Sequence, residues 1–171
     1  RSSLGKTALQ GYQEIVKRLE ASDADRKGWA VSASHNSDRA SNAIDKNKDS
    51  RWDSGTSQVP GMWYQIDLKT ERVVEKISLD TTGSNGDYPR KFEVYTSFDG
   101  NNWGSSVAEG VGERPVTVIS IPSKSARFVK IVQTGSVEGT YWSIHDLTMV
   151  ISTNKEELQH AYDVLKKYEN Q

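Results

Sequence analysis

The sequence has no cysteine among its 171 residues. Disulfide bridges, thiol catalysis and cysteine-ligated metal sites are therefore excluded. An excess of charge of one sign is also missing, because 22 Lys and Arg stand against 23 Asp and Glu and the formal net charge is −1. A nucleic-acid partner or an anionic membrane surface would need a basic excess, so neither is expected. No apolar run approaches the roughly 20 residues of a membrane span.

What is present divides into three parts. All five Trp residues lie between Trp29 and Trp142, whereas both ends are charged and contain no Trp. We therefore expect a central domain over 28–151, with a helix and linker over 1–27 and a helix over 152–171. The sequence opens on Arg1 without Met or a signal peptide, so we expect a segment of a larger protein.

Both ends are predicted to be helical. Apolar residues recur at helical spacing over 4–20, which is typical of an amphipathic helix. Thr153 and Glu156 form a capping box, and an apolar stripe continues to about Glu169. Isolated helices of this length are marginal in water, so we expect the two helices to pair with each other. The alternative is that each belongs to a neighbouring module.

Between the helices, short segments rich in β-branched and aromatic residues alternate with turn formers. The predicted strands cover 29–34, 62–68, 73–81, 92–97, 116–121, 127–134 and 144–151. In the third of these, alternation turns Val73, Ile77 and Leu79 inward, and Glu75 breaks the pattern. Many short strands without intervening helices indicate a mainly β, antiparallel sandwich or barrel.

The stretch 42–56 is too polar for a helix or a strand. Short oxygen-bearing side chains recur at Asp45, Asn47 and Asp49, and this is what a calcium ion requires of a loop. The stretch lacks the Gly and Glu that an EF-hand loop has at its sixth and twelfth positions. Ile44 and Trp52 anchor the loop on both sides and favour an ion site, whereas the alternative is a solvated turn.

No catalytic constellation is present in the sequence. The Asp and Glu residues are scattered over predicted turns and solvent faces, and no pair is framed as glycoside hydrolysis requires. His35, His145 and His160 do not have zinc-site spacing, and there is no nucleophile elbow or phosphate-binding glycine loop. We therefore expect this chain to bind a ligand rather than to catalyse a reaction.

Residues 43–52 (AIDKNKDSRW) resemble the Ala-x-Asp-Gly-Asn-x-x-Thr-x-Trp signature of discoidin, or factor V/VIII C-type, domains. Segments 87–103 and 126–146 agree with the family in order and spacing. Animal discoidin domains usually carry a disulfide, so its absence points to the bacterial branch, the family 32 carbohydrate-binding modules. The resemblance covers about 29–151 and implies a jelly-roll β-sandwich of the galactose-binding-domain type, flanked here by the N- and C-terminal helices.

The resemblance also implies one structural calcium ion. Its ligands would be the Asn42 carbonyl, the Asp45 carboxylate, Asn47, Ser50 through carbonyl and hydroxyl, the His145 carbonyl and the Asp146 carboxylate. Lys46 replaces the usual Gly, and Asp146 replaces the usual Glu with a side chain shorter by one methylene. We therefore expect weaker calcium affinity than is usual in the family.

The family's sugar site lies in loops beside the calcium loop, but the galactose-type residues are largely absent. Asp53 stands where a His is usual, and Thr56 where a Trp is usual. We predict a terminal glucose- or glucosamine-type sugar instead. The predicted site comprises Tyr141 or Tyr88 as the aromatic face, Asp53, Arg90, His35 and Gln58 as hydrogen-bonding groups, and Trp142 divided between core and rim. A surface salt bridge is the alternative for Arg90, and core packing is predicted for Trp52, Trp63 and Trp103.

These observations predict a non-catalytic carbohydrate-binding module of a larger bacterial glycoside hydrolase. Chitin, chitosan and β-glucan are the candidate substrates of this parent enzyme. The expected partners are carbohydrate and the other modules of the parent protein, in a secreted, periplasmic or cell-surface location. The alternative is a protein-interaction or adhesion module on the same fold. A membrane-binding role has thin support, because the loops offer only Val59, Pro60, Met62 and Val137 as apolar spikes.

Overall fold

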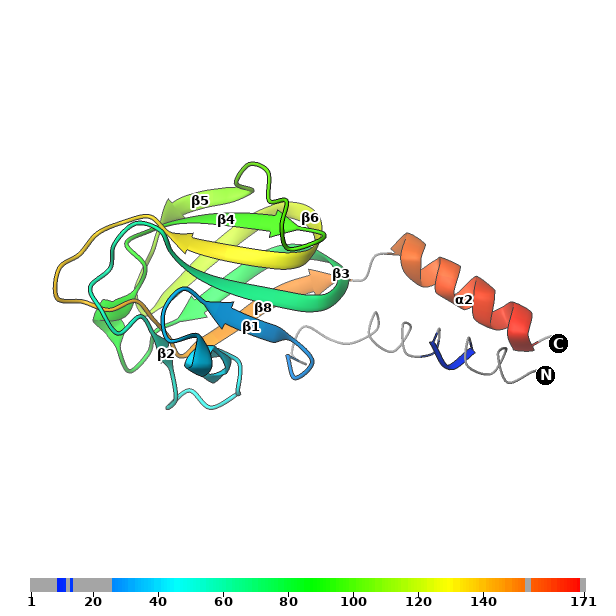
Figure 1. The fold of residues 1–171 in the computed structure, drawn as a ribbon, viewed down its shortest axis with the longest axis horizontal. Helices are drawn as coiled ribbons and strands as arrows, with labels where there is room; N and C mark the ends of the chain where they lie inside the picture. The colour runs from blue at the N-terminus through cyan, green and yellow to red at the C-terminus, as the bar shows by residue number, and fades with distance from the viewer. Residues whose placement is uncertain (1–8, 12, 14–25, 153–154, 170–171) are drawn as a thin grey trace.

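The computed structural model describes residues 9–11, 13, 26–152 and 155–169, and most of them form an antiparallel β-sandwich (Figure 1). The strands are β1 (Ala30–Ala33), β2 (Trp52–Asp53), β3 (Met62–Asp80), β4 (Lys91–Ser97), β5 (Ala108–Val111), β6 (Val116–Gln133), β7 (Ser143–Ile144) and β8 (Asp146–Ser152). The other elements are two short 3-10 helices, η1 (Ser37–Ala43) and η2 (Asn85–Asp87), and the helix α2 (Lys155–Glu169). The predicted mainly β, antiparallel fold is confirmed.

Two long strands, β3 and β6, run through both layers of the sandwich. The first part of β3 pairs with β1 and the last part of β6, and its second part pairs with β8 and the first part of β6. Strands β4 and β5 extend the sheet beyond β6, while β2 and β7 form a separate two-stranded sheet. Register shifts between Asp67 and Arg72 mark the bend of β3. The predicted segments 62–68 and 73–81 are therefore one bent strand, as are 116–121 and 127–134.

A β-bulge explains the irregular pattern of the second half of β3. The register shifts between Val74 and Lys76, so the inward-facing residues are Val74, Ile77 and Leu79. Val73, which was predicted to face inward, is only half-buried. The bulge inserts one extra residue into the alternation, and Glu75 consequently stays exposed.

The core lies between the layers and reaches into the loop end. Trp52 and Trp142 are fully buried and pack edge to face, with ring centroids 5.0 Å apart. Tyr64 packs on Trp52 at 5.3 Å, and its hydroxyl donates to the carbonyl of Ala40 in η1. These contacts fix η1 and β2 against the sandwich.

The predicted C-terminal helix is present as α2, which leaves the sandwich at the end opposite the long loops (Figure 1). Thr153 of the predicted capping box lies outside the described residues. The predicted N-terminal helix also lies almost wholly outside them, although residues 9–11 and 13 are helical. The predicted pairing of the two helices therefore stays a prediction. Neither α2 nor any other described helix is long and apolar enough to span a membrane.

Candidate functional site

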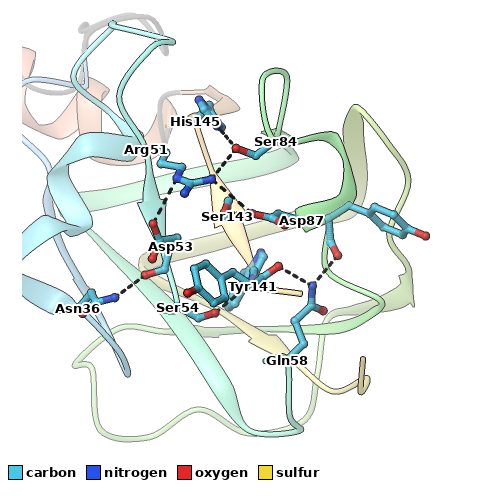
Figure 2. Close-up of polar contacts among 12 residues, drawn as sticks. Asn36, Arg51, Asp53, Ser54, Gln58, Ser84, Asp87, Tyr141, Ser143 and His145 are labelled. Carbon is cyan, nitrogen blue, oxygen red and sulfur yellow. Dashed lines mark hydrogen bonds and ion pairs between the residues drawn. The ribbon is translucent and has the colours of Figure 1, made fainter. Parts of the chain in front are cut away.

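A buried glutamine holds together three loops at one end of the sandwich. The Gln58 amide nitrogen donates to the carbonyls of Tyr88 at 2.9 Å and Tyr141 at 3.1 Å, and its oxygen accepts from the Arg90 backbone N–H at 3.1 Å (Figure 2). Because Gln58 is only 1% exposed, its amide serves the protein rather than a ligand. The prediction of Gln58 as a sugar contact is therefore wrong, and its role is to position the loops.

A cluster of charged and hydroxyl side chains, which we call the Arg51 cluster, lies at the same end of the sandwich (Figure 2). The Arg51 guanidinium lies 3.2 Å from the Asp53 carboxylate and 3.5 Å from that of Asp87. It also donates to the Ser84 hydroxyl at 2.6 Å, and the Ser143 hydroxyl donates to Asp87 at 2.6 Å. The cluster therefore combines two carboxylates, one guanidinium and two hydroxyls.

Of these groups, only Asp53 was predicted from the sequence. A usable signal existed, because side chains alternate across a strand and Trp52 in β2 is buried. Its neighbours Arg51 and Asp53 must then project together away from the core. The contribution of Asp87 and Ser143 arises from tertiary packing, since they lie 36 and 92 residues after Arg51 along the chain.

Tyr141 supplies an aromatic ring at this end, whereas Trp142 does not. Tyr141 is 41% exposed, and Trp142, the next residue, is fully buried against Trp52. The complete burial of Trp142 decides between the two possibilities that the sequence left for it. It belongs to the core, and its prediction as a sugar-binding residue is wrong.

Arg90 and Tyr88 contact each other. The Arg90 guanidinium lies 3.8 Å from the centroid of the Tyr88 ring and donates to the Tyr88 carbonyl at 2.7 Å. One face of Tyr88 is therefore covered, and Tyr141 is the better stacking surface. His35 is half-buried, shares a 2.8 Å hydrogen bond with Ser34, and accepts from the Trp52 indole N–H through its carbonyl. Its predicted contact with sugar stays a prediction.

A shallow hollow of about 300 Å³ lies at this end between the 57–59 and 136–138 segments, which a backbone bridge between Gln58 and Val137 joins. The loop end thus combines an exposed aromatic ring with charged planar groups and a shallow depression. An aromatic face offers apolar contact to the C–H surface of a sugar, and charged planar groups make strong, directional hydrogen bonds with its hydroxyls.

The predicted calcium loop brings oxygen atoms together around the Ser50 hydroxyl. Its oxygen lies 2.8 Å from the Asn47 carbonyl and 3.4 Å from the Asn42 carbonyl, and it also contacts the Asp45 carboxylate. A hydroxyl has one proton and can satisfy only one of these three acceptors. Two carbonyls, a carboxylate and a hydroxyl form the kind of hard-oxygen set that calcium prefers. These four residues therefore fit the ion.

The two predicted ligands from the last strands have further partners. The buried His145 ring contacts the Lys48 carbonyl at 2.7 Å and the Ser84 hydroxyl at 2.9 Å, so the ring has a structural role. The Asp146 carboxylate pairs with Arg26 at 2.6 Å. Arg26 therefore engages one Asp146 oxygen, and the assignment of Asp146 and of the His145 carbonyl to calcium stays a prediction.

The fold and the loop end define a non-catalytic β-sandwich module of the ligand-binding type. The F5/8 type C domain model matches residues 27–147, and the chain belongs to this family. Among curated proteins, galactose oxidase from Gibberella zeae is 30% identical over 128 residues, which are 69% of this chain and 19% of the relative. The chain thus spans about a fifth of the length of the curated relatives that it matches.

Solved structures with a similar fold include family 32 carbohydrate-binding modules and a chitosan-binding module. The module from Clostridium perfringens NanJ in complex with galactose is 25% identical, with a TM-score of 0.62 over 72% of this chain and 94% of that one. The module of AlyQ in complex with 4,5-unsaturated mannuronic acid is 22% identical, with a TM-score of 0.59 over 70% and 92%. The chitosan-binding module 1 of a chitosanase/glucanase from Paenibacillus sp. IK-5 is 20% identical, with a TM-score of 0.61 over 71% and 93%.

Proposed function

We propose that this chain binds carbohydrate at the Arg51 cluster and Tyr141. The observation that carries the proposal is the placement of Tyr141, an exposed ring beside a cluster of charged planar groups. Gln58 fixes the backbone of Tyr141 relative to that of Tyr88 before any ligand arrives. A site that is already ordered loses little conformational freedom on binding, and this favours a weak, shallow ligand such as a terminal sugar.

The charge of the site supports a glucose- or glucosamine-type sugar. Asp53 and Asp87 bring two carboxylates, and Arg51 compensates one of them. The remaining acceptor capacity suits an ammonium group or a pair of sugar hydroxyls. Galactose is bound by the similar NanJ module. In this chain, however, Asp53 and Thr56 stand where galactose-binding members usually have His and Trp.

The parent protein is proposed to be a secreted, carbohydrate-active enzyme. A family 89 glycoside hydrolase from Clostridium perfringens contains a region of similar fold, with 19% identity over 79% of this chain and 15% of that one. This supports a glycoside hydrolase as the parent. The match to galactose oxidase from a fungus supports a carbohydrate oxidase as the second candidate, and it also leaves the bacterial origin a proposal.

A structural calcium ion is proposed for the 42–50 loop. The Asn42 and Asn47 carbonyls, the Asp45 carboxylate and the Ser50 hydroxyl would hold it, because they converge in the structure. When bound, the ion would neutralise the converging oxygens and stiffen the loop. His145 connects this loop to the Arg51 cluster, since its ring bridges the Lys48 carbonyl and the Ser84 hydroxyl. Order in the loop would therefore extend to the sugar site.

Titration calorimetry with glucose, glucosamine, N-acetylglucosamine oligomers and galactose tests the function. We expect the glucose- or glucosamine-type sugars to bind most tightly, with a Kd of about 0.1 mM or weaker, equivalent to roughly −5 to −6 kcal/mol. Tyr141→Ala and Asp53→Asn should each weaken binding at least tenfold. Val118→Ala, an exposed apolar residue of β6 outside the site, is the matched control and should change nothing.

Tightest binding of galactose would overturn the proposed sugar class. Binding that survives both Tyr141→Ala and Asp53→Asn would show that the ligand lies elsewhere. A glycan array on which the protein binds nothing would favour the alternative role, a protein-interaction or adhesion module on this fold.

A further inference from the structure

A second hollow lies at the other end of β4 from the Arg51 cluster. It measures about 410 Å³ and lies between the turn that follows β4 and the bend of β6. Its lining residues are Thr96, Ser97, Phe98, Asn102, Trp103, Gly104, Ser105, Ser106, Val107, Lys124 and Ser125. Strand β4 starts beside the loops of the candidate sugar site and spans seven residues, so the two sites are roughly 20 Å apart along the sandwich.

The turn that forms one wall is held rigidly. The Asp99 carboxylate accepts hydrogen bonds from the backbone N–H groups of Asn101 and Asn102 and from the Asn102 amide, at 2.7 to 2.9 Å. The backbone bonds from Asn102 and Asn101 hold the pKa of Asp99 well below its usual value. The Ser97 hydroxyl accepts from the backbone N–H groups of Asp99 and Gly100. The wall is therefore formed before any ligand binds.

The floor beside this turn is aromatic. The Trp103 ring meets Phe128 edge to face at 6.5 Å, and the Lys130 ammonium lies 4.2 Å from the Trp103 centroid. Gly100 packs directly on Phe128, because a Cβ at this position would lie 3.2 Å from the ring. These contacts fix the turn against β6 and leave Trp103 half-buried at the edge of the hollow.

The fold does not account for the exposed position of the Phe98 side chain. This side chain is 62% exposed at the tip of this ordered turn, so it contributes little to the core. Within residues 26–152, the exposed aromatic side chains are Phe98 and Tyr141. One ring therefore stands at each end of the sandwich, and each lies at or beside a hollow.

We propose that this second hollow binds a neutral or acidic oligosaccharide, which would make the module bivalent. Phe98 offers an apolar face for stacking, and the hydroxyls of Ser105 and Ser106 and the Asn102 amide offer hydrogen bonds to sugar hydroxyls. Lys124 is the charged residue among the described residues that line the hollow, and the nearby Asp99 carboxylate already accepts three N–H donors. The hollow therefore disfavours a cationic ligand. Its preference is thus the reverse of that proposed for the Arg51 cluster, which carries two carboxylates.

Two weak sites on one rigid module act together on a polysaccharide that can reach both. The second contact becomes intramolecular, so the overall affinity for a long chain exceeds that of either site. This inference does not require the sugar class proposed for the Arg51 cluster, because the two sites share no residue.

Amide chemical-shift titration of the whole chain tests the second site. The probes are cellohexaose, a galacturonic acid hexamer and a glucosamine hexamer. We expect saturable shifts over 97–106 and 124–125 with at least one of the first two probes, and none there with the glucosamine hexamer. The dissociation constant obtained from these shifts should be unchanged in Tyr141→Ala and in Val118→Ala. It should rise at least tenfold in Phe98→Ala.

The absence of shifts over 97–106 with all three probes would overturn the inference, as would shifts that disappear in Tyr141→Ala or a preference for the glucosamine hexamer. Phe98 is exposed, so its removal should leave the melting temperature unchanged and any loss of binding interpretable. If shifts occur over 97–106 but none occur at the Arg51 cluster, the result contradicts the proposed function and supports the second site.

Discussion

Removal of the Arg26 guanidinium is expected to destabilise the sandwich strongly. Arg26 precedes β1, and one of its terminal nitrogens donates to the Asp146 carboxylate at 2.6 Å and to the Leu147 carbonyl at 2.7 Å. The side chains of the ion pair are 8% and 12% exposed. This pair connects the start of the domain to its last long strand, 120 residues away in the sequence.

The expected magnitude follows from the burial of the pair. Loss of one partner from a buried ion pair leaves the other charge uncompensated, at a cost of about 3 to 5 kcal/mol. Among the described residues, the buried Arg26 Nε atom has no hydrogen-bond partner. We therefore expect Arg26→Ala to cost about 3 kcal/mol, a large share of the 5–15 kcal/mol typical of a domain.

Urea unfolding followed by Trp fluorescence measures this cost. At a slope of about 2 kcal/mol per M, the midpoint should fall by roughly 1.5 M in Arg26→Ala. Arg39→Ala, which removes an exposed arginine in η1, is the matched control and should shift the midpoint little. The double variant Arg26→Ala/Asp146→Ala should lose less stability than the sum of the single variants, because neither charge is then left alone.

A buried, coupled ion pair would be refuted if Arg26→Ala lowered the free energy of unfolding by less than about 1 kcal/mol. It would also be refuted if the effects of Arg26→Ala and Asp146→Ala were strictly additive in the double variant. The same series tests Asp146 as a calcium ligand. If the Asp146 carboxylate binds only Arg26, Asp146→Asn should lower the free energy of unfolding by the same amount with calcium and with chelator. If the carboxylate also binds the ion, the loss should be larger with calcium.

Three further predictions concern other described residues. Lys46→Gly should raise stability by up to about 1 kcal/mol, because Lys46 has φ 63°, a conformation that disfavours side chains; a lower urea midpoint would contradict this. Chelation should lower the melting temperature, since a ligand that binds only the folded state stabilises it, and Asp45→Ala should abolish that sensitivity; an identical melting curve in chelator would argue against the ion. For Asp67, burial acts to raise the pKa, but hydrogen bonds from Arg127 and a backbone N–H and the charge of Arg127 outweigh it and lower the pKa below 3.8. The stabilisation is then complete above about pH 5 and is lost as pH falls through the lowered pKa, so Asp67→Asn should flatten the acid limb of the stability profile measured by urea unfolding; an unchanged acid limb would count against it.

Much of the fold is encoded in local sequence patterns. The predicted strand 92–97 is present as β4, and its residues Phe92 and Val94 are both buried, because every second side chain of a regular strand faces the same side. The family signature in 43–52 identified the sandwich, and the apolar stripe predicted α2. The oxygen-rich loop was also recognisable, since its Asp and Asn side chains cap their own backbone, as Asp45 does for the Asn47 N–H.

Tertiary structure alone decided the features that depend on distant segments. The bulge beside Val74 is set by pairing with β6 and β8, so alternation misassigned Val73. Pairing of β2 with β7 settled that Trp142 packs on Trp52. No local pattern encodes such contacts, because they depend on which surfaces meet after the chain has folded.

The candidate site shows the same division. The sequence by itself predicted Asp53 and Tyr141 as ligand contacts, and it predicted the burial of Trp52 beside Asp53. Only the folded structure showed that Trp142 is buried in the core while its neighbour Tyr141 is exposed. The sequence could not reveal that Arg51 would meet Asp87, or that Arg26 would engage Asp146. Two charged side chains from distant segments pair only when packing of the apolar core brings those segments together. The arrangement of charges in the site is therefore a property of the folded structure.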